Sequence, residues 1–217
     1  MASPGLSKPG RRTPGPRRSE GAPAGPQAVR RAVLDAAADL FARRDVDGVS
    51  LRNIAAAADV QLALIARYVG TRKELIDAVF DDLSASLAQE LTDRPLEQIS
   101  FERDSTMGRW IVLLRHLVIT GAGPDRATAS FNPVRALARV LEDSYGADPA
   151  GAAVRAAQIA ALALGWRLFE RYLIAAGRLE QIPVQDLRDD VTALNRRIGA
   201  TPWPSGPGLS LPDTGSG

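Results

Sequence analysis

The sequence contains no cysteine and a single histidine, His116. These absences exclude disulfides, metal–thiolate sites and any metal site that needs two imidazoles. No glycine-rich phosphate loop follows a strand pattern, and no nucleophile-elbow motif is present. Paired carboxylates occur at residues 81–82 and 189–190, but consecutive helical side chains diverge, so a solvated face fits them better than an acid–base pair. We therefore expect no enzyme, no metal and no cofactor.

Long apolar runs are also lacking. No segment approaches the roughly 20 apolar residues that a membrane-spanning helix needs, and no apolar stretch follows the basic N-terminus as in a secretion signal. At 217 residues, of which 45% are hydrophobic, the chain is nonetheless apolar enough to build a core. We expect a soluble cytoplasmic protein with no membrane partner.

Charge is distributed unevenly along the chain. Residues 1–75 carry 13 basic and 7 acidic side chains, whereas residues 76–217 carry 14 basic and 18 acidic ones. Frequent proline and glycine near the N-terminus disfavour helices and strands. We predict a disordered basic arm over residues 1–26, which is either a solvated leader or a non-specific DNA-touching arm. Residues 201–217 are similarly turn-rich and are expected to form a flexible tail.

Between these ends, apolar residues recur every three to four positions, so the body is predicted to be all-α. The first three predicted helices span about residues 27–43, 51–57 and 61–69, and a fourth runs from residue 72 to about residue 91. Ser50 is positioned to cap the second helix. Thr71 and the glutamate three residues later form a capping box at the start of the fourth helix.

The two short helices, joined by only three or four residues, predict a helix-turn-helix. Ala55 and Ala58 are small enough to let these helices cross closely. Asp59 tolerates the left-handed backbone conformation that the turn requires. Ile65 and Val69 face inward on the second of the two helices. Its leading residues are therefore predicted to enter the major groove of DNA, while flanking cations meet phosphates.

The chain resembles the TetR family of bacterial transcriptional regulators in two segments, "AVLDAAADLFARRDVDGVSLRNIAAAADV" and "RYVGTRKEL". The corresponding family pattern is a first helix ending in "LF", then "SLRxIAxxAxV", a recognition helix and "RYxGS/TxxEL". The resemblance implies an N-terminal helix-turn-helix DNA-binding domain over residues 27–75. It also implies a C-terminal helical ligand-binding and dimerisation domain over residues 76–200.

The chain departs from the family pattern around the turn and recognition helix. Where the family commonly has Gly, Ser, Tyr and Phe, this chain has Asp59, Gln61, Ala66 and Val69. The usual serine hydroxyl and tyrosine phosphate contact are therefore missing at Gln61 and Ala66. Other cations near the recognition helix must supply the phosphate anchoring if DNA is bound.

Several side chains in and around this motif suit DNA contact. Gln61 is suited to pair with adenine through its amide, and Arg67 lies on an outer face that suits phosphate. Leu62 suits a thymine methyl or partial burial, and Tyr68 suits a phosphate or packing against the first helix. The two cations that begin the fourth helix suit phosphates or a solvated helix start. The candidate DNA-binding residues are Ser50, Arg52, Gln61, Leu62, Ala63, Arg67, Tyr68, Arg72 and Lys73.

The C-terminal body contains four further predicted helices, over about residues 107–120, 131–146, 152–177 and 184–198. Residues 159–166 include no polar side chain, and a helix that is apolar all round is buried on both faces. The last helix repeats leucine, valine and isoleucine at coiled-coil-like spacing. Two such helices from each of two chains make the four-helix interface through which TetR proteins usually dimerise. The alternative is an internal bundle within one chain.

The resemblance also implies an unknown small-molecule effector inside the helical domain. Apolar pockets are commonly lined by aromatic side chains and a few polar groups, although each such residue here also suits an ordinary core. Neighbouring helical positions diverge, so at most one of Arg115 and His116 faces a given cavity. The candidate ligand-binding residues are Met107, Trp110, His116, Phe131, Trp166 and Phe169.

The predicted function is a ligand-responsive homodimeric transcriptional regulator, expected to be a repressor, that binds a palindromic double-stranded DNA operator. The alternative is a TetR-like dimer that binds a ligand or a protein and whose DNA binding is weakened or lost. Asp59, Gln61 and Ala66 motivate that alternative. Salt-dependent binding to operator DNA distinguishes the two, and turnover of a bound ligand would point instead to an enzyme.

Overall fold

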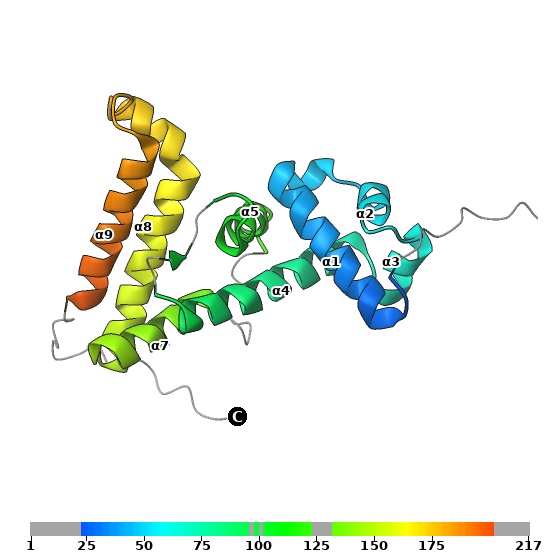
Figure 1. Ribbon diagram of the computed structural model, residues 1–217, viewed down its shortest axis with the longest axis horizontal. Coiled ribbons are helices and arrows are strands. Elements are labelled where there is room, and N and C mark those ends of the chain that lie inside the picture. Colours follow the sequence, from blue (N-terminus) through cyan, green and yellow to red (C-terminus); the bar gives the residue numbers. More distant parts are fainter. Residues whose placement is uncertain (1–22, 96–97, 100–101, 123–131, 202–217) are drawn as a thin grey trace, which may run out of the picture.

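The computed structural model describes residues 23–95, 98–99, 102–122 and 132–201. Within these residues every regular element is helical, which confirms the predicted all-α class (Figure 1). The predicted helices are all present, with ends that differ by a few residues. The elements are α1 (Pro26–Arg43), the 3-10 turn η1 (Val46–Gly48), α2 (Leu51–Ala57), α3 (Leu62–Tyr68), α4 (Arg72–Asp93), α5 (Thr106–Ile119), α7 (Pro133–Tyr145), α8 (Pro149–Ala176) and α9 (Val184–Ala200). The predicted basic arm up to residue 22 and the predicted tail from residue 202 lie outside the described residues.

Side-chain caps determine where the short helices of the N-terminal part begin. The Ser50 hydroxyl accepts a hydrogen bond from the Asn53 amide at 3.2 Å, and the Asn53 side-chain oxygen accepts one from the Ser50 amide at 3.1 Å. Thr71 and Glu74 form the same reciprocal pair at the start of α4. Asp59 adopts a left-handed backbone with a φ of 51° in the turn between α2 and α3. Both predicted caps and the predicted turn conformation are therefore confirmed.

Helices α1 to α5 share one hydrophobic core, which we call the front core. Its largest fully buried side chains include Phe41, Ile54, Ile65, Leu75 and Leu113. We call α1, α2 and α3 the head. α4 extends from the head to α7, so no structural break separates residues 75 and 76 (Figure 1). The front core consequently reaches beyond the helix-turn-helix and includes α5.

Helices α7, α8 and α9 surround a second, smaller group of buried side chains, which we call the rear core. It consists mainly of alanine and leucine, and Ile198 of α9 packs against it. Gly199 allows α9 to approach α7 closely, because a Cβ atom at this position would lie only 3.0 Å from the Leu141 side chain. The small residues of the rear core thus bring three helices together without burying large side chains.

The C-terminal half of α8 leaves large apolar side chains in solvent. Leu168, Phe169 and Tyr172 are exposed by 43%, 58% and 71%. α8 contains a window of 18 residues with a mean hydropathy of 1.2, of which only 22% is buried within the chain. By length and composition alone α8 can cross a membrane, a candidate that the sequence analysis overlooked, although core helices of soluble proteins meet the same criterion. Within one chain α8 buries a single face, through Gly151, Ala152, Ala156, Ile159 and Ala163. The chain itself therefore does not cover both faces of this helix, contrary to the prediction.

Candidate functional site

The outer face of α3 is the part of the head most suited to DNA. Ile65 is fully buried and holds the helix on the front core. Gln61 precedes the first helical residue, and Ala63 and Arg67 are exposed beyond it. Leu62 is 42% exposed, a large apolar side chain in solvent at the leading end of the helix. The candidate base-contacting residues therefore lie together on a face that no other described element covers.

Arg67 and Tyr68 contact each other at the end of α3. The guanidinium carbon of Arg67 lies 5.3 Å from the centre of the Tyr68 ring, a geometry that permits a cation–π interaction. Tyr68 also packs against the front core, and its backbone carbonyl accepts a hydrogen bond from Arg30 at 3.4 Å. The tyrosine ring is thus partly structural, and it supports an arginine whose charge is directed outward.

Ser50 and Arg52 flank the start of α2. Ser50 is occupied by its reciprocal hydrogen bonds with Asn53, so its side chain is first a helix cap. Arg52 is exposed on the solvent side of the same helix. Arg52 therefore presents a cation at the surface. Ser50 can contact DNA only while its side chain is also hydrogen-bonded to Asn53.

Arg72 and Lys73 begin α4 but have different surroundings. The Arg72 guanidinium donates hydrogen bonds to the backbone carbonyls of Val46 and Val49, at 2.5 Å each. These bonds tie α4 to the turn before α2. Lys73 is 80% exposed and forms an ion pair with Asp77 at 3.0 Å. Sequence reasoning treated the two cations alike, but the structure uses Arg72 to hold the head together and leaves Lys73 at the surface.

An apolar cavity lies between the front core and the rear core. The hollow is open to solvent, and together with the open space at its mouth it spans about 730 Å³. Its walls come from α4, α5, α7, α8 and α9, together with Ile99, and two candidate ligand residues, Met107 and Trp110, line it. The remaining lining residues are Leu87, Leu91, Pro133, Val134, Leu137, Ile159, Ala160, Ala163, Leu164, Thr192, Asn195 and Arg196.

Trp110 is held firmly at the wall of this cavity. Its indole N–H donates a hydrogen bond of 2.9 Å to the buried Ser84 hydroxyl, and its ring stacks on Phe80 with centroids 5.9 Å apart. Because the indole N–H is already paired with α4, Trp110 offers the cavity an apolar ring and no free donor.

The other described candidate ligand residues do not line the cavity. His116 is directed toward the head, where its Nδ1 lies 3.9 Å from an Asp47 carboxylate oxygen. Trp166 lies in a smaller hollow beside Arg188 on α8 and α9. Phe169 is exposed, and Phe131 lies outside the described residues. Their assignment to an effector site therefore remains a prediction.

Sequence reasoning missed the buried polar residue of the cavity, Asn195. This side chain is buried, with only 8% of its surface exposed, and its carbonyl oxygen has no hydrogen-bond partner among the described residues. It lies one helical turn from Val191 and Ile198, on a helix that the sequence analysis interpreted only through its apolar repeat. An asparagine one turn from such a repeat is a detectable signal, but its burial depends on α7 and α8.

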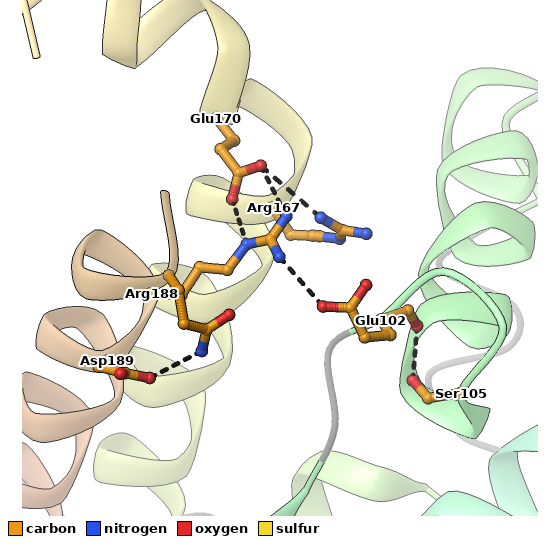
Figure 2. A network of polar contacts seen from close by, with 7 residues as sticks. Glu102, Ser105, Arg167, Glu170, Arg188 and Asp189 are labelled. Atoms are coloured by element: carbon orange, nitrogen blue, oxygen red, sulfur yellow. Dashed lines mark hydrogen bonds and ion pairs between the residues drawn. The ribbon is translucent and has the colours of Figure 1, made fainter. Parts of the chain in front are cut away.

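A polar cluster centred on Arg188 joins α9, α8 and the segment before α5 (Figure 2). The Arg188 guanidinium donates to both carboxylate oxygens of Glu170, at 2.8 and 3.0 Å, and to Glu102 at 3.1 Å. The hydrogen bonds from Arg188 lower the pKa of Glu170 below its ordinary value, although burial opposes this effect. The neighbouring Arg103 donates to the Ala42 carbonyl at the end of α1. The cluster thus connects the rear helices with the head.

A second connection between the rear and the head runs through α5. Arg109 of α5 forms an ion pair of 2.8 Å with Asp39 of α1, two helices that also pack against each other. The same helix carries Met107 and Trp110 on the cavity wall. α5 therefore contacts both the cavity and the first helix of the head.

Comparison with known proteins agrees with this geometry. Residues 33–79 match the family described as bacterial regulatory proteins, tetR family. The chain is 32% identical over 177 residues to the HTH-type transcriptional repressor Rv3405c of Mycobacterium tuberculosis, covering 81% of this chain and 92% of the relative. The HTH-type transcriptional regulator Mb3439c of Mycobacterium bovis matches with the same identity and coverage. No solved structure matches the chain.

Proposed function

The chain belongs to the TetR family of bacterial regulatory proteins, and from this premise we propose that it is a homodimeric repressor released from its operator by a small molecule. As a member of this family it is a transcriptional regulator with a helix-turn-helix, a class distinct from enzymes. The proposal adds a palindromic operator, a second copy of the chain and an effector. In this proposal the protein acts in the cytoplasm, where bacterial DNA is accessible.

The exposed face of α3 is the observation that carries the DNA-binding part of the proposal. Arg67 is directed outward at one end of the helix and Leu62 is exposed at the other. In the major groove an exposed leucine at this position contacts thymine methyl groups. Gln61 and Ala63 extend the same contact, and Arg52 and Lys73 supply phosphate contacts on either side.

Dimerisation is supported by the uncovered apolar side chains of α8 and α9. These helices lie side by side at one end of the molecule, remote from α3 (Figure 1). Contiguous exposed apolar and aromatic side chains are typical of protein–protein interfaces. The exposed members are Leu168, Phe169, Tyr172, Val184 and Leu194. Pairing through them makes a four-helix interface and leaves both heads free to contact successive half-sites on one face of the duplex.

Effector response is supported by the position of the cavity between the two cores. A ligand shifts a conformational equilibrium only by its difference in affinity for the two states. A cavity bounded by helices of both cores changes shape whenever those cores move relative to each other. α5 and the Arg188 cluster then carry that movement to α1. A bound effector thereby favours one separation of the two heads. Repression itself is supported by the name of the relative Rv3405c, a repressor.

The first experiment is a fluorescence-anisotropy titration with DNA from upstream of the protein's own gene and a scrambled duplex, at several salt concentrations. We expect preference for the upstream DNA and an affinity that falls with salt, because phosphate contacts release counterions. Arg67→Ala should weaken specific binding by about tenfold or more. Arg139→Ala, which removes an exposed arginine of α7, serves as the matched control and should leave binding unchanged.

Equal, weak binding to both duplexes would contradict the proposed operator recognition. It would instead favour the second candidate, a TetR-like dimer whose head has lost its operator through Asp59, Gln61 and Ala66. Sedimentation velocity tests the dimer separately. Phe169→Glu should convert the dimer to monomer, whereas Tyr145→Glu, at an exposed aromatic on α7, should not. A wild-type monomer at micromolar concentration would overturn the dimer part of the proposal.

A further inference from the structure

Asn195 differs from every other described side chain of the cavity between the cores. It is more than nine-tenths buried, and its side-chain oxygen has no hydrogen-bond partner among the described residues. Leaving a buried amide oxygen unpaired destabilises the folded state. An apolar side chain of similar size would avoid that cost at a position surrounded by leucine, isoleucine and alanine. The contacts of the unliganded monomer therefore do not explain why an asparagine occupies this position.

The neighbouring polar groups of the cavity do not satisfy this oxygen. Thr192 lines the same wall, but its hydroxyl donates to the Arg188 carbonyl at 3.0 Å. The Trp110 indole N–H, an aromatic donor in the cavity wall, is paired with Ser84. Among the described cavity residues, Asn195 is thus the buried acceptor that a bound molecule has to satisfy.

We propose that Asn195 is the specificity-determining residue of the cavity, and that the effector is a small, largely apolar molecule carrying one hydrogen-bond donor, a hydroxyl or an N–H. This inference rests on the proposed function, because it names the ligand class of the proposed effector site. The apolar walls supply most of the affinity by removing hydrocarbon from water. The donor pairs with the Asn195 oxygen and selects among ligands of equal size, since an analogue without the donor leaves the oxygen unpaired.

The position of Asn195 also links ligand recognition to the rear helices. It lies two helical turns after Arg188 on α9 and one residue before Arg196, at the cavity wall. Arg188 in turn holds Glu170 of α8 and Glu102 before α5 (Figure 2). A ligand that draws Asn195 toward its donor acts on the same helix that carries this cluster.

The test uses three probes of similar shape, 4-phenylphenol, 4-methoxybiphenyl and biphenyl, with calorimetric titration of the full chain. We expect 4-phenylphenol to bind about tenfold more tightly than its methyl ether, the preference that one hydrogen bond to a buried acceptor supplies. Asn195→Leu should abolish that preference and leave biphenyl binding unchanged or tighter. Gln185→Leu, at an exposed amide of the same helix that does not line the cavity, is the matched control and should retain the preference.

Other results would overturn the inference. A phenol preference that persists in Asn195→Leu would mean that Asn195 is merely a structural residue. Absence of binding by all three probes up to their solubility would exclude this ligand class. Tighter binding of biphenyl-4-carboxylate, lost in Arg196→Gln, would assign the polar end of the ligand to Arg196 instead. All these readouts are independent of DNA, so the proposed operator recognition can fail while the ligand inference stands, and the reverse.

Discussion

The front core and the rear core bury different kinds of side chain. The front core encloses large residues such as Phe41 and Ile54 completely, although Val118 and Ile119 at the end of α5 remain exposed. The rear core consists largely of alanine, with two leucines and an isoleucine, while Phe169 and Tyr172 remain exposed on the same helix. The difference teaches that one chain covers the large side chains of the front core, whereas the rear helices leave theirs for the proposed second copy to cover.

The largest expected effect comes from truncating the front core. Phe41→Ala should lower the free energy of unfolding by about 3–5 kcal/mol, because it removes a fully buried aromatic ring and leaves a cavity. The loss should be the same at low and high protein concentration. Phe169→Ala should instead reduce the dependence of the unfolding midpoint on concentration. Urea unfolding at two protein concentrations measures both effects. The same concentration dependence in the two variants would contradict the proposed difference between the cores.

The next effect concerns Arg72, which joins α4 to the turn before α2. Arg72→Met should cost about 2 kcal/mol, since the carbonyls of Val46 and Val49 lose charge-assisted hydrogen bonds. Lys73→Met, at the neighbouring exposed cation, should change stability by less than about 0.5 kcal/mol. Chemical denaturation compares the two variants. A loss in Lys73→Met as large as in Arg72→Met would show that the hydrogen bonds to the turn contribute nothing special.

Helix caps allow a finer comparison between the two regions. Thr71→Ala removes one half of the capping box of α4 and should cost about 1 kcal/mol. Asn132→Ala removes the cap of α7 in the rear part and should cost a similar amount. Thermal unfolding measures both. A much larger loss at Thr71 would mean that the start of α4 also controls how the helix-turn-helix packs on it.

The smallest effect is a pH dependence in the rear part. The pKa of Glu170 is lowered from its ordinary value of 4.5, chiefly by hydrogen bonds from Arg188. Its stabilising contribution is therefore complete above pH 4.5 and disappears as the pH falls through the lower pKa of the folded state. Arg188→Gln should lower the free energy of unfolding by about 1 kcal/mol or less at neutral pH, and this deficit should shrink in acid.

Two controls isolate this pH effect. Glu170→Gln should remove most of the same pH-dependent part, because only the more exposed Glu102 carboxylate then remains opposite Arg188. Stability is measured by urea denaturation between pH 3 and pH 7. A deficit in Arg188→Gln that stays constant across that range would contradict the assignment to Glu170.

Local features of the head could be predicted because they depend on residues close in sequence. The caps at Ser50 and Thr71, the left-handed Asp59 and the inward Ile65 all follow from side chains within a few positions. The cavity could not be predicted in the same way. Of the five described candidate ligand residues, only Met107 and Trp110 line it, because cavity membership depends on how five helices meet. His116 was singled out by residue type, yet it is directed toward the head.

Sequence by itself determined the all-α class, the helix-turn-helix and the capped helix starts, since hydrophobic period and local hydrogen bonding act over a few residues. Tertiary structure alone decided that Arg72 serves the turn before α2, that α5 joins the front core, and that Asn195 lies buried on the cavity wall. These outcomes depend on which elements come together in space. Residues far apart in the chain, such as Asn195 and Met107, have no local sequence pattern that predicts their proximity.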